Sequence, residues 1–376
     1  MIEKYFICYL KTGGGHFAPS KSLFEYFNKN YENKVDPILI DGLENSSKAV
    51  RFIIEDGYRL MQNHAKWYYE LIYAANKIFI FKELNIFLCK VLLKKYFKNR
   101  IKNDNPSKII IVHFLLIEPI VEAIKDLKLN IPVYVLITDP FSIHSIWLKH
   151  KKLNYIVFSE VAKQICIKNK IKENSVLVFP FILNSKFNEQ LNSKEIRNIK
   201  LSYNIEPSRK IILIIGGGDG IPRGNQIIKS LIKNKNYHFI MVCGRNKKLF
   251  NDVVKLKDEH DNLTVFTFSN KIYEFINISH LVITKAGASI IFEILSQNKI
   301  PIITDYIWEQ ELGNKDFVVN NSLGFYENKI KNLNPLIRDL VENENHFLQI
   351  QKKIYSLKIK NGTKEICEYL VKSKTL

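Results

Sequence analysis

The sequence has few cysteines and no long apolar run, and these two absences exclude several classes of protein. Its five cysteines are widely spaced and form no Cys-x-x-Cys pair, which argues against a disulfide framework and against a zinc site. The longest apolar run, around residues 109–117, is interrupted by His113 and is far too short to span a bilayer. The N-terminus has neither a basic region nor a cleavage site, so no signal peptide is expected. We therefore expect a cytoplasmic protein with reduced thiols.

The glycine-rich turns lack the residues that two common nucleotide-binding loops require. One glycine run occupies residues 13–15 and another occupies residues 216–218, each after an apolar strand. Neither is followed by the Lys-Ser/Thr pair of the nucleoside-triphosphatase loop, and the strand-end acid about twenty residues on, which a dinucleotide fingerprint requires, is missing. An Asp-x-Asp motif at a strand end is also absent. We therefore expect neither a metal ion nor another cofactor.

Acidic residues are scarce relative to basic ones, with 37 Asp and Glu against 56 Lys and Arg and a net charge of +19. The excess is concentrated in residues 48–102, where basic residues outnumber acidic ones and alternate with aromatic side chains. Such a stretch suits an anionic membrane surface or a nucleic acid, although no nucleic-acid motif accompanies it. The alternative is a solvated helix surface with an ordinary apolar core face.

The apolar runs follow the order of an α/β protein with two domains. At 376 residues the chain is long enough for about two domains. Strands are predicted at residues 5–10, 109–112, 133–137, 155–158 and 176–178, and again at 210–215, 239–242, 264–268, 281–284 and 300–303, with helices between them. This order predicts two doubly wound, Rossmann-like parallel sheets with a cleft between them.

The predicted boundary lies in a polar, strand-poor stretch at residues 181–209. We place an N-terminal domain at residues 1–185 and a C-terminal domain at residues 186–376. The closing segment, about residues 334–371, has a helical pattern. It could pack back on the N-terminal domain.

Three polar side chains follow predicted strands of the N-terminal domain. His16 comes after the first strand and its glycine run, and Asp139 and His144 come after the strand at residues 133–137. The carboxyl ends of parallel strands share one edge of a sheet, where ligands bind in open α/β folds. A histidine there can act as a general base near neutral pH, so we expect a reactive site. The alternative is that His16 only caps a helix or closes a turn.

Residues 281–314 form the most informative stretch of the C-terminal half. A strand runs through Lys285 and Gly287 into a helix, an arrangement that points backbone N–H groups and the helix dipole at one spot and suits a phosphate. Glu293 lies further along that helix, where a carboxylate could reach a ribose hydroxyl pair. A polar cluster follows the next strand and could hold a sugar: Gln310, Glu311 and Asn314. Together these features predict a nucleotide-sugar pocket, although a lone strand-Gly-helix turn can also bind nothing.

Five short motifs occur in a fixed order along the chain. They are Gly-Gly-Gly-His at residues 13–16, Thr-Asp-x4-His-x2-Trp at 138–147, Cys-Gly-Arg-Asn-Lys-Lys-Leu at 243–249, Ile-Thr-Lys-Ala-Gly at 283–287 and Gln-Glu-Leu-Gly-Asn at 310–314. With these motifs the chain resembles glycosyltransferase family 28, and within it the monogalactosyldiacylglycerol synthases, over residues 5–326. The peptidoglycan N-acetylglucosaminyl transferases and the processive diacylglycerol glucosyltransferases share the same frame but look less similar around the last motif.

The resemblance implies a GT-B fold, with an N-terminal acceptor domain and a C-terminal UDP-sugar domain. The implied reaction is an inverting, metal-independent transfer of a hexose, galactose first, from a UDP-sugar to the 3-hydroxyl of 1,2-diacylglycerol. The resemblance assigns catalysis to His16, Asp139 and His144. It assigns donor binding to Gly217, Gly218, Asp219, Arg245, Lys285, Gly287, Glu293, Gln310, Glu311 and Asn314. It assigns acceptor or membrane contacts to Gly14, Gly15, Trp67 and Trp147.

The resemblance also favours the membrane over nucleic acid as the partner of residues 48–102, and implies a peripheral protein on the cytoplasmic face of the cell membrane. Two departures from the family pattern concern the acceptor side: Leu183 replaces a frequent basic residue, and Phe114 follows His113 where a proline is usual. Three alternatives stay open. They are glucosyl transfer to diacylglycerol or a sterol, a cell-wall lipid transferase that uses UDP-N-acetylglucosamine, and a basic binding protein without catalysis.

Overall fold

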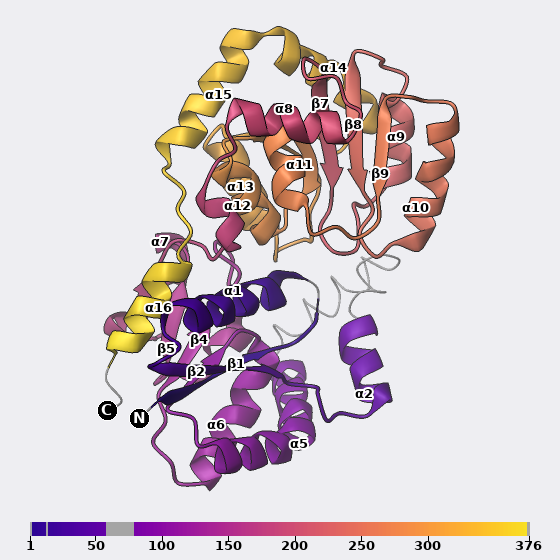
Figure 1. Cartoon of the computed structure of the whole chain (residues 1–376). Coiled ribbons are helices and arrows are strands. Elements are labelled where there is room, and N and C mark those ends of the chain that lie inside the picture. The colour runs from indigo at the N-terminus through magenta and orange to yellow at the C-terminus, as the bar shows by residue number, and fades with distance from the viewer. Residues whose placement is uncertain (1, 13, 58–78, 374–376) are drawn as a thin grey trace. The chain divides into compact units, whose positions relative to one another are not determined.

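The computed structural model describes residues 2–12, 14–57 and 79–373 of the chain. The chain folds into two compact units, each with its own parallel sheet and flanking helices (Figure 1). The first unit comprises Met1–Asn184, Trp308–Gln310 and Asn361–Leu376, and the second comprises Ser185–Ile307 and Glu311–Lys360. The predicted fold class, two doubly wound α/β sheets, is therefore confirmed.

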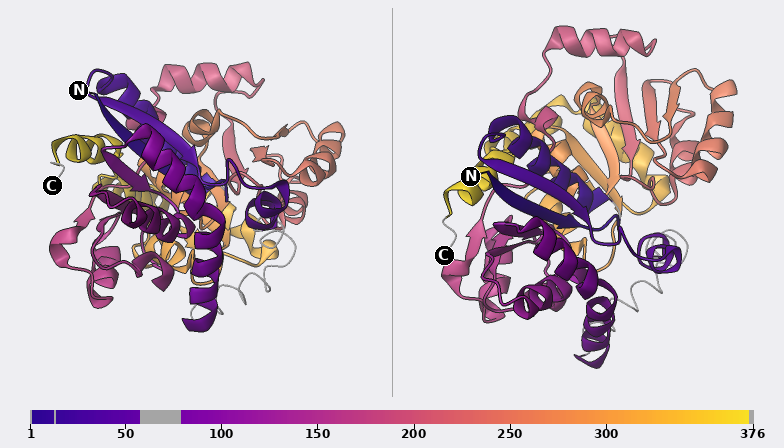
Figure 2. Two further views of the ribbon diagram at one scale, coloured as in Figure 1. Left: turned by 90° about the horizontal axis from the view of Figure 1, so that it is seen from below. Right: turned by 60° about the horizontal axis from the view of Figure 1, so that its bottom comes forward.

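The first unit is built on a six-stranded parallel sheet in the order β2-β1-β3-β4-β5-β6. Its strands are β1 (Glu3–Tyr9), β2 (Val35–Asp41), β3 (Lys108–Ile111), β4 (Val133–Leu136), β5 (Asn154–Val157) and β6 (Val176–Val178). Figure 2 shows β1 and β2 side by side in indigo. The central strands are continuous apolar runs because a parallel sheet is covered on both faces, and every residue of β4 is buried.

Helices flank this first sheet. They are α1 (Gly14–Asn30), α2 (Lys48–Arg51), α5 (Phe79–Asp104), α6 (Ile117–Asp126), α7 (Glu160–Lys168) and α16 (Thr363–Lys372), with short turns η1 (Phe52–Asp56), η2 (Phe114–Leu116), η3 (Ser145–Leu148) and η4 (Glu173–Ser175). Buried side chains of α5 and α6 pack against apolar residues of β1, β3 and β4 in one core cluster. Each fully buried aliphatic side chain of this kind stabilises the fold by roughly 1.5–3 kcal/mol.

The second unit repeats the plan with a six-stranded parallel sheet in the order β12-β11-β10-β7-β8-β9. Its strands are β7 (Lys210–Ile215), β8 (Tyr237–Val242), β9 (Leu263–Phe266), β10 (Leu281–Lys285), β11 (Ile300–Asp305) and β12 (Phe325–Tyr326). Its helices and turns are η5 (Ser185–Asn188), α8 (Ser193–Ser202), α9 (Gly224–Leu231), α10 (Lys247–Val254), η6 (Lys255–Asp258), α11 (Ile272–Ile278), α12 (Ala288–Ser296), α13 (Leu312–Asn320), α14 (Ile330–Glu342) and α15 (Glu344–Ser356).

The structure differs from the sequence-based expectations in four places. β2 and β12 were not predicted. A helix was expected to begin at about Pro19, whereas α1 begins at Gly14, so His16 lies within its first turn. The polar stretch expected as a connection contains α8, which a capping box of Asn192 and Glu195 starts. A helix can therefore form in a polar segment because its first turn is capped by side chains.

The C-terminal helix α16 packs on the first unit, beside α1 (Figure 1). The buried Lys108 ammonium donates to the Leu370 carbonyl of α16 at 2.7 Å and to the Tyr5 hydroxyl at 2.9 Å. The last carbonyls of a helix have no partner within the helix, and a lysine there also meets the negative end of the helix dipole. Lys108 thus fixes the C-terminal helix to the interior strands β1 and β3 of its own unit, although burial lowers its pKa.

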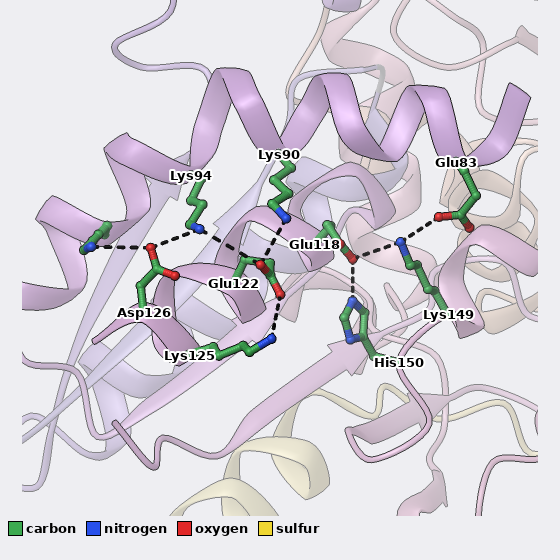
Figure 3. A network of polar contacts seen from close by, with 10 residues as sticks. Glu83, Lys90, Lys94, Glu118, Glu122, Lys125, Asp126, Lys149 and His150 are labelled. Carbon is green, nitrogen blue, oxygen red and sulfur yellow. Dashed lines mark hydrogen bonds and ion pairs between the residues drawn. The ribbon is translucent and has the colours of Figure 1, made fainter. Parts of the chain in front are cut away.

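Ion pairs join α5 to α6 and the segment after η3, as Figure 3 shows. Lys90 lies 3.1 Å from Glu122, and Lys94 and Lys98 lie 3.0 and 3.4 Å from Asp126. The lysines and the acids each recur about every four residues, which places each set on one face of its helix. Three of the lysines in the basic stretch of residues 48–102 are therefore paired with acids of α6.

The same network continues at Glu118, which lies 2.7 Å from His150 and 3.4 Å from Lys149. The hydrogen bond from His150 and the charge of Lys149 lower the pKa of Glu118.

All five cysteines are buried and none forms a disulfide. In the portion of the chain that the structure describes, none of the helices combines the length and the apolar character needed to cross a membrane.

Replacing Lys108 with methionine should lower the free energy of unfolding by about 1–3 kcal/mol, because the buried Leu370 carbonyl loses its charged donor. Urea unfolding followed by circular dichroism measures this loss. The matched control is Lys125→Met, since Lys125 is largely exposed and pairs with Glu122 at 3.8 Å, and it should change stability by less than about 0.5 kcal/mol. Equal effects of the two variants would contradict the role given to Lys108.

Candidate functional site

The strand order places one candidate site in each unit. In the first sheet the order reverses between β1 and β3, which pair directly. In the second sheet it reverses between β7 and β10, which also pair directly. Ligands bind open α/β sheets at the carboxyl ends of the strands beside such a reversal. His16 and His113 follow β1 and β3, and the glycine turns follow β7 and β10, so the predicted residues lie at these two points.

His16 is buried in the first turn of α1 and held by the neighbouring strand ends. Its Nδ1 lies 2.7 Å from the carbonyl oxygen of Val112 and 3.2 Å from the hydroxyl of Thr138. A carbonyl oxygen only accepts, so Nδ1 carries the proton and Nε2 keeps its lone pair. Burial lowers the pKa of His16 to about 4, against the opposing effect of the Val112 hydrogen bond. His16 is therefore a neutral base at physiological pH.

His113 lies beside His16, with ring centroids 4.4 Å apart and an interplanar angle of 63°. Its Nδ1 accepts the backbone N–H of Leu115 at 3.2 Å. Burial, and then the nearby His16, hold the pKa of His113 well below its ordinary value. Both rings are therefore neutral, because a second positive charge at this separation in a dry site would be costly.

Asp139 and His144 follow β4 at the same sheet edge, as their positions after the predicted strand implied. Asp139 comes directly after Thr138. His144 starts η3, where its Nδ1 accepts the N–H of Ile146 at 3.3 Å. Trp147, expected at the acceptor or membrane surface, is only 1% exposed and lies 6.2 Å from the His16 ring. Any contribution of Trp147 therefore passes through packing behind His16 and not through a surface contact.

The remaining acceptor-side residues divide between described and undescribed parts of the chain. Gly14 and Gly15 are exposed at the start of α1, and a methyl group added to either would meet no atom within 4 Å. Trp67 lies outside the described residues.

Two glycine turns of the second unit pack against each other at the ends of β7 and β8. Gly244 has a φ of +61°, and a side chain there would come within 2.4 Å of the Gly218 carbonyl. The Arg245 N–H donates to that same carbonyl at 2.8 Å. Gly217 also has a positive φ, +89°, with open space beside it. The open space beside Gly217 lets a ligand approach the backbone of this turn closely.

Asp219 and Arg245, both predicted donor residues, pair across these two turns. The Arg245 guanidinium donates to the two Asp219 oxygens at 3.1 and 3.5 Å. Both side chains are partly exposed. The pair holds the guanidinium over Gly218. A Cβ added to this glycine would meet the Arg245 Nη2 first. Arg245 is thus kept at the rim of the sheet, where an anionic ligand could compete for it.

The turn from β10 into α12 has the form that suits a phosphate. Gly287 is the N-cap residue and supplies no capping side chain, so the first N–H groups of α12 point outward without a side-chain partner. In the part of the chain that the structure describes, the buried hydroxyl of Ser289 in this first turn has no hydrogen-bond partner. A ligand oxygen at this helix terminus would satisfy these donors.

Glu311, predicted to hold a sugar, is buried and already has two partners. Its Oε1 lies 2.8 Å from the Lys285 ammonium, and its Oε2 accepts the Ile307 N–H at 2.9 Å. Asn314 donates to the Ala286 carbonyl at 2.8 Å, whereas its buried Oδ1 has no partner among the described residues. Lys285, Glu311 and Asn314 therefore form one polar cluster that ties the β11–α13 segment to the β10–α12 turn.

Glu293 lies on α12, two turns from the helix N-cap. Burial raises the pKa of its carboxyl group to about 8. Desolvation is the single cause of this shift, and among the described residues no neighbouring charge opposes it. A ligand that donates hydrogen bonds to it, as a pair of hydroxyls does, would stabilise its ionised form.

Gln310 lies in the short segment Trp308–Gln310, which groups with the first unit and not with the second. Its neighbours Glu311 and Asn314 belong to the second unit. Within the described ranges, no three histidine, cysteine or acidic side chains gather closely enough to hold a metal ion.

Sequence reasoning missed three contacts at these sites. Thr138 precedes Asp139 in the family motif but was given no role, and His113 was noted only as the end of a strand. The pairing of Lys285 with Glu311 was also not expected. Their common signal is a polar residue directly after a strand, which predicts the sheet edge but not which side chains meet there.

Two family models match the chain. The monogalactosyldiacylglycerol (MGDG) synthase model matches residues 16–180, and the glycosyltransferase family 28 C-terminal domain model matches residues 211–366. These ranges contain all of the predicted site residues except Gly14 and Gly15. The first range lies in the part of the chain that forms the first sheet, and the second range lies in the part that forms the second sheet.

Curated relatives match nearly the whole chain. The processive diacylglycerol beta-glucosyltransferase of Bacillus pumilus (strain SAFR-032) is 23% identical over 378 residues, which cover 100% of this chain and 96% of that protein. The protein of the same name from Bacillus subtilis (strain 168) is 23% identical over 365 residues, which cover 96% and 92% of the two chains.

Solved structures show the same fold. Acinetobacter baumannii MurG aligns with a TM-score of 0.60 and 13% identity, covering 98% of this chain and 100% of that one. The S. aureus MnaA–UDP co-structure aligns with a TM-score of 0.61 and 12% identity, covering 98% and 96%. At such identities the likeness concerns the fold, and that fold is GT-B, as the sequence resemblance implied.

The neutral state of His16 predicts a loss of stability in acid. The pKa is about 4 in the folded protein and about 6.5 in an unfolded chain. Between these values the unfolded state binds more protons, so stability falls as the pH falls, by about 2 kcal/mol from pH 7.5 to 5.0 for this one group. Urea unfolding of His16→Gln should show a pH dependence smaller by that amount.

The control for this experiment is His346→Gln, because His346 is partly exposed in α15 and lies 3.7 Å from Asp339. In this variant the free energy of unfolding should change between pH 7.5 and 5.0 by the same amount as in the wild type, within about 0.5 kcal/mol. An unchanged pH dependence in His16→Gln would show that His16 is not held neutral.

Proposed function

Because the chain belongs to glycosyltransferase family 28, we propose that it transfers a hexose from a UDP-sugar to diacylglycerol. Relatives named as diacylglycerol glucosyltransferases span almost the whole chain, and the model that matches its N-terminal half is named for a diacylglycerol galactosyltransferase. The observation that carries the proposal is His16, a buried neutral imidazole whose Nδ1–H is already engaged. Its Nε2 lone pair is the group that a hydroxyl acceptor requires.

The proposed donor is UDP-glucose, with UDP-galactose as the second candidate. The sequence resemblance favoured galactose, whereas the full-length relatives are named beta-glucosyltransferases. The two sugars differ in the orientation of one hydroxyl group. A few polar contacts of the kind offered by Glu311 and Asn314 are enough to distinguish them. The direct comparison of both donors is therefore part of the test below.

In the proposed reaction His16 Nε2 accepts the proton of the diacylglycerol 3-hydroxyl. The hydroxyl oxygen forms a bond to the anomeric carbon, while the bond from that carbon to the β-phosphate oxygen breaks. The electron pair leaves with UDP. UDP-hexoses have an α linkage, so attack from the opposite side gives the β product with inversion.

The leaving diphosphate needs stabilisation of its growing negative charge. The uncapped N-terminus of α12 and the exposed backbone around Gly217 offer N–H donors, and Arg245 offers a guanidinium. Preorganised donors of this kind can take the place of a metal ion. We therefore propose a reaction that proceeds without a divalent cation and without another cofactor.

Glu293 is the proposed ribose ligand. Burial raises its pKa to about 8, so an unpaired carboxylate there is unfavourable near neutral pH. The 2′- and 3′-hydroxyls of a ribose would each donate a hydrogen bond to it. Binding of the nucleotide would therefore stabilise the ionised Glu293 carboxylate, because each hydrogen bond from the ribose favours the charged form.

We also propose that one face of α5 contacts the lipid bilayer, as a peripheral attachment. Four adjacent side chains of this face are between 47% and 61% exposed: Phe87, Leu88, Val91 and Leu92. Lys90, Lys94 and Lys98 of the same helix pair with α6, so the attraction to anionic lipid that the basic stretch suggested is partly neutralised within the protein. The apolar face is what supports the proposal.

The reaction is tested with radiolabelled UDP-glucose and, separately, UDP-galactose, using diacylglycerol vesicles in the presence of EDTA. One monoglycosyldiacylglycerol should form from one donor. His16→Ala should lower its rate by roughly 10²–10⁴-fold, since the general base is lost. Glu293→Ala should raise the KM for the donor about tenfold, as expected for a lost hydrogen bond to a charged group.

The control for these rates is His346→Gln, which should transfer hexose at the wild-type rate. Absence of glycolipid from either donor, with folded protein, would overturn diacylglycerol as the acceptor. A rate that EDTA abolishes and Mg²⁺ restores would overturn the metal-independent mechanism.

The bilayer contact is tested by co-sedimentation with phosphatidylcholine vesicles that contain phosphatidylglycerol. Phe87→Ser combined with Val91→Ser should weaken binding more than tenfold, since burial of each side chain is worth roughly 1.5–3 kcal/mol. The control, Val161→Ser with Leu201→Ser, changes two side chains of similar exposure on α7 and α8. If both double variants bind equally well, α5 is not the attachment face.

A further inference from the structure

Nδ1 of His16 lies within hydrogen-bonding distance of two oxygens that come from two different strands. The Val112 carbonyl follows β3 and lies 2.7 Å away, and the Thr138 hydroxyl follows β4 and lies 3.2 Å away. β3 and β4 are neighbours in the sheet with a fixed register. The sheet therefore sets the positions of both oxygens, and Thr138 is only 4% exposed.

We propose that Thr138 is a positioning residue for His16: its hydroxyl oxygen and the Val112 carbonyl share the Nδ1 proton and keep the Nε2 lone pair available to the acceptor hydroxyl. This inference rests on the proposed function, in which Nε2 accepts that proton. It adds a residue to which neither the sequence motif nor the relatives gave a role.

The tautomer follows from the inventory of donors and acceptors. A backbone carbonyl only accepts, so the single proton of neutral His16 lies on Nδ1. Thr138 can then only accept from Nδ1, with its own O–H turned elsewhere. A single acceptor restrains the ring through one contact, whereas two acceptors on adjacent strand ends restrain the plane of the ring more tightly.

The neighbouring ring of His113 has the opposite tautomer. Its Nδ1 accepts the N–H of Leu115 at 3.2 Å, so its proton lies on Nε2. His113 can therefore donate from Nε2 but cannot accept there. Of these two rings, whose centroids are 4.4 Å apart, only His16 offers an Nε2 lone pair. The contact geometry distinguishes the base from its neighbour.

Positioning by Thr138 should act on the chemical step more than on binding. When Nε2 takes the acceptor proton, His16 becomes an imidazolium and its Nδ1–H becomes a charged donor. Hydrogen bonds from a charged donor are stronger than neutral ones, so the contacts with Val112 and Thr138 strengthen as the transition state forms. Interactions that strengthen only there raise kcat and leave KM nearly unchanged.

Two matched pairs of variants isolate the hydroxyl oxygen. Thr138→Val replaces the hydroxyl of the wild type with a methyl group of similar size, and Thr138→Ser compared with Thr138→Ala differs only in the oxygen. The second pair keeps the test valid if the valine variant does not fold. Each full-length protein is labelled with ¹⁵N-histidine and is also assayed for hexose transfer to diacylglycerol.

The first readout is the ¹⁵N spectrum of the His16 ring, which does not depend on the reaction. Long-range ¹H–¹⁵N spectra, assigned with His16→Gln, should show the proton on Nδ1 in the wild type and in Thr138→Ser. Thr138→Val and Thr138→Ala should keep this tautomer, because the Val112 carbonyl remains, but should shift the Nδ1 resonance, since Nδ1–H loses one of its two acceptors. The second readout is kinetic: kcat should fall roughly five- to tenfold without the oxygen, with both KM values within about twofold of the wild type, and serine should restore it.

Two results would overturn the inference. One is an unchanged His16 spectrum in folded Thr138→Val or Thr138→Ala. The other is an equal loss of kcat in Thr138→Ser and Thr138→Ala, which would assign the effect to packing of the methyl group. If the wild type transfers no hexose while its His16 spectrum shows the Nδ1 proton and responds to loss of the oxygen, the proposed function fails and the positioning of His16 stands.

Discussion

Parallel pairing of strands that are distant in sequence is the constraint on which both sites depend. β1 pairs with β3, with Tyr5 opposite Lys108, and β7 pairs with β10, with Ile212 opposite Leu281, so the partners lie far apart in the sequence. Each pairing brings two strand ends to the point where the strand order reverses. His16 and His113 come together only through the first pairing, and the glycine turns near Gly217 and Gly287 only through the second. Local sequence supplies the side chains, and the sheets supply their proximity.

The polar groups of His16 and those at the N-terminus of α12 differ in whether they already have partners. Around His16 the polar atoms are paired with neutral partners, the Val112 carbonyl and the Thr138 hydroxyl, so burial there preserves an uncharged base. In the second unit Ser289 Oγ and Asn314 Oδ1 are buried without partners among the described residues. Burying such atoms costs free energy unless they gain hydrogen bonds. Unsatisfied polar atoms near a helix N-terminus are typical of a ligand-binding site. The hydrogen bonds around His16 are instead typical of a reactive group that is held in place.

The sequence predicted the strands that are continuous apolar runs, because such runs have few other places in a soluble α/β fold. It did not predict β2, whose Asp36 and Pro37 interrupt the apolar pattern at an edge of the sheet. It placed His16 and Asp139 after the carboxyl ends of strands and Glu293 within a helix, as the structure has them. It could not place Thr138 against His16, or Lys285 against Glu311, since these contacts depend on strand register and on side-chain rotamers. The burial of Trp147 was missed for the same reason.

The charge distribution shows why a count of basic side chains is a poor guide to a binding surface. The chain has 56 Lys and Arg, yet Lys90, Lys94 and Lys98 lie against acids of α6, and Lys108 is buried against a helix terminus. Charges paired in this way attract an anionic surface less than their number suggests, because the neighbouring carboxylates cancel much of their field. Apolar contact with lipid is not cancelled by neighbouring acids and is only weakly sensitive to salt. The exposed apolar face of α5 is therefore the stronger physical basis for attachment to a bilayer, with electrostatics a secondary contribution.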